Sequence, residues 1–120
     1  MNELFVRGVA EFNAGRFFEA HDVWEELWRE TSGESRIFYQ GLIQSAVGLY
    51  HLTAGNHRGA CSQLRKSLAK LEHYLPAYHG INTQDFVDRV RRCLRDAELP
   101  GSGHPVVTDP RPMPQIHMYT

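Results

Sequence analysis

The chain has 120 residues, of which 42% are hydrophobic, and a formal net charge of −1. A chain of this size and composition fits one compact domain, which excludes a need for a structural metal or for disulfides in order to fold. No secretory leader is recognisable, and Cys61 and Cys93 fall within helical patterns. We therefore expect reduced thiols and a cytoplasmic location.

The near-neutral total hides an asymmetry between the two halves of the chain. Residues 1–35 carry eight acidic side chains against three arginines, whereas residues 56–95 carry eight basic side chains against three acidic ones. We interpret the basic residues as solvated helix faces, because no aromatic residues are interleaved with them as in single-strand binders. Nucleic-acid contact is the less favoured alternative, through Arg58, Arg65, Lys66, Arg89, Arg92 and Arg95.

The spacing of apolar residues predicts five helices in an all-α fold. Their expected ranges are Glu3–Ala14, Phe17–Glu30, Ser35–Ala54, His57–Leu75 and a segment from Asn82 to about Leu99. Gly15 and Gly55 are natural C-terminal stops, and Pro76 ends the fourth helix. In the turn before the third helix, the Thr31 and Ser32 hydroxyls and Glu34 predict a side-chain cap.

Residues 12–20 are echoed by residues 52–60 at an offset of 40 residues. An alanine, a glycine and a second alanine coincide, and Trp24 falls opposite Leu64. The chain is thus expected to form two antiparallel helical hairpins plus a fifth helix, in a tetratricopeptide-like or bundle arrangement. We assign residues 1–99 to this domain and residues 100–120, which hold five of the six prolines, to an extended or disordered tail.

The segment between Arg36 and Arg58 contains no charged residue, which indicates the central helix of the fold. Its glutamines and histidine argue against a membrane span. Gly41, Ser45 and Gly48 form a strip of small residues where another helix, from this chain or from a second copy, can approach closely. A homodimer is therefore one expectation.

Polar residues form one line on each of the second and third helices. At 100° per residue, His21, Glu25 and Trp28 share one side of the second helix. Gln40, Gln44 and His51 share one side of the third. Reflection about the short turn brings Glu25 level with Gln40 and His21 level with Gln44, and places Arg36 near Trp28 and Glu25, for stacking or for pairing.

Two interpretations of this cluster stay open. In the structural one, Glu25 accepts hydrogen bonds from Gln40 and Arg36, and His21 bonds to Gln44. In the functional one, His21 and Glu25 bind a divalent metal such as zinc, and His51 or water completes the shell. Arg36, Gln40, Gln44 and Trp28 would then hold a ligand or orient the metal-binding groups.

A longer set of residues resembles a known family. The relevant stretches are residues 15–21, Trp28, residues 36–44, His51, Gly55-Asn56 and Gly59-Ala60. Together they resemble the bacterial and archaeal DUF309 family, with its His-x-x-x-Glu-x-x-Trp/Tyr hallmark at His21, Glu25 and Trp28 over roughly residues 8–75. The resemblance implies an all-helical, soluble prokaryotic protein with no established function, in a family for whose motif metal binding has been suggested.

The sequence accordingly predicts a partly buried polar site between the second and third helices that binds a metal or a small polar ligand. If the site is catalytic, metal-assisted hydrolysis is the expected class, with Glu25 or His21 handling protons. The alternative is a protein-interaction module in which the cluster is structural. An opening onto His21 and Glu25 favours the first hypothesis, and an exposed apolar surface elsewhere favours the second.

Overall fold

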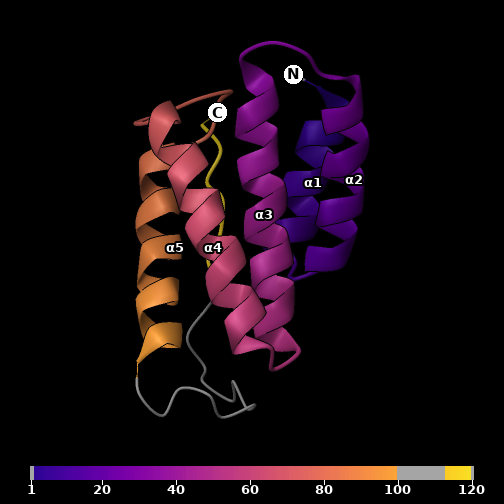
Figure 1. The fold of residues 1–120 in the computed structure, drawn as a ribbon. Coiled ribbons are helices and arrows are strands. Elements are labelled where there is room, and N and C mark those ends of the chain that lie inside the picture. The colour runs from indigo at the N-terminus through magenta and orange to yellow at the C-terminus, as the bar shows by residue number, and fades with distance from the viewer. Residues whose placement is uncertain (1, 100–112, 120) are drawn as a thin grey trace.

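The computed structural model describes residues 2–99 and 113–119. Its helices are α1 (Glu3–Asn13), α2 (Phe17–Glu30), α3 (Ser35–Thr53), α4 (His57–Leu71) and α5 (Thr83–Glu98), with a 3₁₀ turn at Glu72–Tyr74. Figure 1 shows α4, α3 and α2 side by side, with α1 behind α2 and α3. The predicted all-helical fold is confirmed over these residues. None of the described helices combines the length and apolar character needed to cross a membrane.

The two helical hairpins, α1–α2 and α3–α4, have nearly identical turns. Gly15 and Gly55 adopt φ values of 83° and 82°, which a side chain would disfavour. In each turn the residue after the glycine donates its amide to a carbonyl five residues earlier, Arg16 to Glu11 and Asn56 to His51. The 40-residue echo in the sequence therefore corresponds to a repeated structural unit.

The repeat extends to the way each hairpin packs. A Cβ atom added at Gly8 would lie 2.0 Å from Nε1 of Trp24, and one added at Gly48 would lie 2.8 Å from Cδ2 of Leu64. Both pairs are offset by 40 residues. A glycine on the first helix thus lets the second approach closely, and the large residue opposite it is fully buried.

The small-residue strip on α3 is covered by α4 of the same chain. Gly41 faces Leu71, Gly48 faces Leu64, and the Ser67 hydroxyl donates a 2.7 Å hydrogen bond to the Gly41 carbonyl. The sequence allowed the strip to pack against a helix of the same chain or against one of a second copy, and the structure shows a helix of the same chain. A homodimer built on this strip has no accessible surface, so any self-association uses another face.

Two predicted helix ends are wrong. Helix α4 ends at Leu71 instead of Leu75, because the chain tightens into a 3₁₀ turn in which the Tyr74 hydroxyl donates to the Glu34 carbonyl. The expected hydroxyl cap on α3 is absent. Glu34 occupies the cap position without a side-chain bond, and the Thr31 hydroxyl donates back to the Leu27 carbonyl on α2. Helix α5 does begin with a side-chain cap, since the Asn82 side chain accepts a hydrogen bond from the Asp85 amide.

The hydrophobic core extends beyond residue 99. Residues 113–119 are extended, and Ile116 is 2% exposed within the same cluster as the helix side chains. Figure 1 shows this segment passing behind α4, between α5 and α3 in that view. The rest of the tail, residues 100–112, lies outside the described residues.

Candidate functional site

The predicted histidine–carboxylate pair is formed on α2. Nε2 of His21 lies 2.8 Å from Oε2 of Glu25, and Arg29 donates to the other carboxylate oxygen at 2.9 Å. The His21 side chain is 25% exposed and that of Glu25 is 34% exposed. Both are half-buried, as the sequence predicted, and spacing of four residues on one helix is what brings them together.

The second nitrogen of His21 has no good hydrogen bond. Nδ1 lies 3.3 Å from a carboxylate oxygen of Asp22, but this atom is buried and the contact lacks hydrogen-bond geometry. The imidazole is therefore held mainly through Glu25 and by the ring of Phe18, whose centroid lies 5.9 Å away.

Arg36 stacks on Trp28, which is one of the two arrangements that the sequence predicted, the other being an ion pair with Glu25. Its guanidinium carbon lies 3.8 Å from the indole centroid, and Nη1 donates to the carbonyls of Trp28 and Thr31 at 3.2 and 3.1 Å. Arg36 thus ties the end of α2 to the start of α3. The alternative, a bond from Arg36 to Glu25, is not formed, because Glu25 is occupied by His21 and Arg29.

The third-helix residues do not join this pair. Gln44 accepts a 2.9 Å hydrogen bond from Lys70 of α4, and Nδ1 of His51 lies 3.4 Å from Nδ2 of Asn56. Gln40 is half-buried on α3. Across the described part of the chain neither amide is bonded to His21 or Glu25, so the prediction that the two polar lines meet is wrong.

The physical reason is a rotation of α3 about its own axis. Reflection about a turn fixes which residues are level along two helices, but rotation is fixed by packing. Here α4 packs on Gly41 and Gly48, which turns Gln44 toward α4 and leaves Tyr50 toward α2. His21, Glu25 and His51 also do not form a three-ligand set. Residues 2–99 and 113–119 hold no group of three His, Cys, Asp or Glu side chains placed to share a metal ion.

Beside His21 lies an exposed aromatic pair whose exposure the sequence analysis missed. Phe18 is 50% exposed and Tyr50 is 43% exposed, and their ring centroids are 5.6 Å apart across the α2–α3 boundary. The charge-free stretch of α3 was the available clue, because an outward helix arc without charges is unusual for a solvated surface.

A second polar cluster, which the sequence did not predict, lies where α3 begins. The Ser35 hydroxyl is 2.8 Å from Nε2 of His79 and 3.0 Å from the Tyr78 hydroxyl. His79 stacks on Tyr39, with centroids 5.7 Å apart, and desolvation lowers the pKa of the imidazole. The cluster fastens the loop after α4 to the start of α3.

Comparison with known proteins places this arrangement in a family. The family described as "Domain of unknown function (DUF309)" matches residues 5–63. Residues 5–63 of the chain belong to the DUF309 family. An uncharacterized protein of Aquifex aeolicus (strain VF5) is 28% identical over 98 residues, covering 81% of this chain and 29% of the relative. The uncharacterized protein YpuF of Bacillus subtilis (strain 168) is 36% identical over 72 residues, covering 58% of this chain and 41% of YpuF.

The chain therefore spans less than half the length of both relatives. Its DUF309 region runs from α1 to the first turns of α4 and contains all seven residues predicted for the site. Lys70, the partner of Gln44, and the whole of α5 lie outside the DUF309 region.

Proposed function

We propose that this protein is an interaction module that pairs with a second copy of itself through the face formed by α2, α3 and α4. The observation that carries the proposal is the exposed Phe18–Tyr50 pair, formed where α2 meets the C-terminal end of the charge-free arc of α3. The His21–Glu25 pair is then a structural brace beneath the aromatic rings. This is the interaction-module alternative that the sequence left open.

The outward arc of α3 is suited to burial against protein. After Arg36, each residue of α3 that is exposed or half-buried is uncharged; these residues are Ile37, Gln40, Ile43, Gln44, Val47, Tyr50, His51 and Thr53. The 19 residues of α3 make a helix about 28 Å long, and three adjacent helices give a face of roughly 700 Å². That is close to the ~800 Å² per partner of a standard specific interface.

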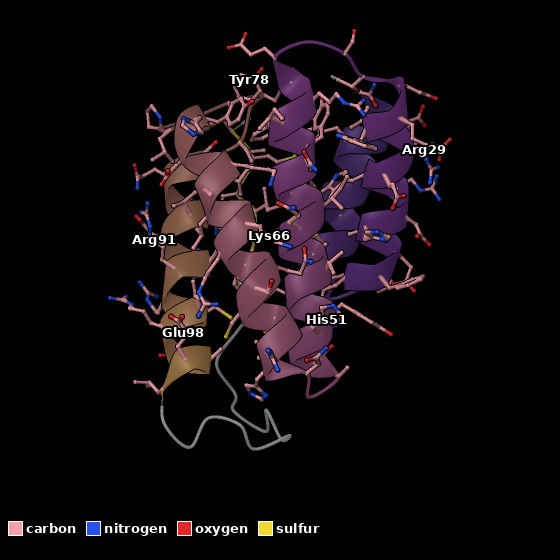
Figure 2. The ribbon with its side chains drawn as sticks, in the orientation of Figure 1. Arg29, His51, Lys66, Tyr78, Arg91 and Glu98 are labelled. Atoms are coloured by element: carbon pink, nitrogen blue, oxygen red, sulfur yellow. The ribbon has the colours of Figure 1, made fainter. Side chains whose placement is uncertain are left out.

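The charges on either side of this arc make the face complementary to itself. Helix α2 carries five acidic residues against one arginine, a net charge of −4, whereas α4 carries four basic residues and no acidic one, a net charge of +4, and one of these four, Arg65, pairs with Glu98 of α5. In Figure 2, α2 with Arg29 lies on one side of α3 and α4 with Lys66 on the other. A two-fold axis parallel to α3 would place α2 of one copy opposite α4 of its partner.

The levels of individual charges agree with this axis. Phe18 is level with Tyr50, so Asp22, one turn along α2, is level with residue 46 of α3. Leu64 packs on Gly48, so Lys66 is also level with residue 46. Under the two-fold axis Asp22 of each copy faces Lys66 of the other.

Sedimentation velocity tests the proposal. We expect wild-type protein to form a dimer that weakens as salt increases, because flanking charges are screened. Phe18→Asp removes an apolar contact from both copies, so we expect the dissociation constant to rise by roughly 30-fold, from about 1 kcal/mol per copy. Val6→Asp, at an exposed residue of α1, is the matched control and should leave the dimer intact. Monomeric wild-type protein at 1 mM or so would overturn the proposal.

A further inference from the structure

The extended segment 113–119 alternates between buried and exposed side chains. Pro114, Ile116 and Met118 face the helices, and the residues between them face outward. Ile116 is 2% exposed, and Met118 packs against the same core cluster. This alternation is the pattern of a β-strand laid in a groove.

At its centre the segment is held through its main chain by one side chain of α1. Nδ2 of Asn13 donates to the Ile116 carbonyl at 2.8 Å, and Oδ1 of Asn13 accepts from the Ile116 amide at 2.8 Å. The Gln115 side chain adds a bond to the Asn13 carbonyl at 2.9 Å. The Asn13 carboxamide therefore contacts the backbone of Ile116 as a neighbouring strand would.

The loop before α5 holds the C-terminal part of the segment, again through backbone groups. The amide of Asn82 donates to the His117 carbonyl at 2.8 Å, and the amide of Tyr119 donates to the Gly80 carbonyl at 2.7 Å. Ile81 forms an antiparallel bridge with Met118. Both sets of contacts thus depend on the extended backbone of the segment. Only the buried positions, Pro114, Ile116 and Met118, can make binding depend on which side chains the segment carries.

We propose that the groove between Asn13 and the Gly80–Asn82 loop is a binding site for extended peptides, filled in the resting chain by residues 113–119. Main-chain pairing with pockets for alternate side chains is a general mode of peptide recognition. The ligand class is an extended segment with the pattern proline-x-isoleucine-x-methionine. The chain's own segment competes at the high effective concentration of a tethered ligand, on the order of millimolar, so an outside peptide binds when that segment is weakened.

Fluorescence anisotropy with a labelled peptide of residues 113–119 tests this proposal on the full chain. Ile116→Ala shortens the buried side chain of the internal segment and leaves the groove unchanged. We expect the peptide to bind this variant at least tenfold more tightly than it binds the wild-type protein. The same labelled peptide with Asp in place of Ile116 is the matched control and should not bind.

Adding Asn13→Ala to the Ile116→Ala chain should weaken peptide binding by tenfold or more while the helical circular dichroism persists. If Ile116→Ala unfolds the chain, the conservative Ile116→Val variant serves, with a smaller gain in peptide affinity expected. A folded variant that fails to bind the peptide at millimolar concentration, or that binds the Asp-containing peptide equally well, would overturn the proposal. Because the groove does not use the α2–α4 face, either proposal can fail without the other.

Discussion

Replacement of Gly8 by alanine probes how tightly α1 and α2 are packed. Alanine normally stabilises a helix relative to glycine by about 1 kcal/mol. Here the new Cβ would lie 2.0, 2.3 and 2.6 Å from three atoms of the Trp24 indole, a side chain that is fully buried. The ring cannot move freely, since Nε1 donates to the Phe5 carbonyl at 3.2 Å and Phe12 lies against the indole at 5.7 Å. We therefore expect the usual stabilisation to be reversed.

The magnitude follows from the contacts. Overpacking a dense core costs up to about 3 kcal/mol, and stranding the buried indole N–H adds roughly 1 kcal/mol. After the helix gain of about 1 kcal/mol is subtracted, Gly8→Ala should lower the free energy of unfolding by about 3 kcal/mol. For a domain of this size the melting temperature should fall by roughly 10 °C.

Urea unfolding followed by circular dichroism measures this change, and Gly48→Ala is the matched control. At Gly48 the new Cβ would lie 2.8 and 2.9 Å from Cδ2 and Cγ of Leu64 and 3.3 Å from the Ala60 carbonyl oxygen, contacts that are longer than those at Gly8 and that involve an aliphatic side chain instead of a hydrogen-bonded indole. The cost there should be smaller, below about 1.5 kcal/mol. Equal stability of Gly8→Ala and wild-type protein would refute the packing described for the first hairpin.

Three further predictions concern other parts of the molecule. Ser67→Ala should cost about 1 kcal/mol in chemical denaturation, because it removes a buried bond to the Gly41 carbonyl, whereas Ser62→Ala, at an exposed position of α4, should be neutral. Burial lowers the pKa of His79 below its ordinary 6.5 in the folded protein, so the unfolded chain binds the proton first as the pH falls. The stability contributed by neutral His79 is present above pH 6.5 and is lost below it, and His79→Asn should flatten this part of the stability–pH profile; an unchanged profile would contradict the assignment. Protein purified without chelator or affinity tag should have the same zinc content as the His21→Ala/Glu25→Gln double variant, and a wild-type excess in elemental analysis would favour the metal hypothesis.

The sequence predicted the helices well because the signals for them are local. Periodic apolar residues located the five helices found within residues 2–99, and Gly15 and Gly55 located the two hairpin turns. The repeat was visible for the same reason, since a turn that requires a positive φ and a close helix approach both demand glycine. Where α4 ends was less predictable, because that end depends on Tyr74 reaching the distant Glu34 carbonyl.

The candidate site was predicted only in part, because it depends on both local spacing and tertiary packing. His21 and Glu25 lie four residues apart on one helix, so their contact follows from spacing alone. The partner of Gln44 depends on how α3 is rotated, and packing on α4 decides that rotation. Ile116 lies 103 residues from Asn13 in sequence, and no local pattern could predict their contact.

Charge reversal at the proposed dimer contact tests the central claim most directly. Asp22→Lys or Lys66→Glu alone places like charges opposite each other twice per dimer, and each should raise the dissociation constant by about tenfold or more at low salt. The double variant restores opposite charges across the two-fold axis, so its dissociation constant should return to within about threefold of the wild-type value. Additive losses in the double variant, measured by sedimentation, would contradict the pairing of α2 with α4 and with it the account of this face.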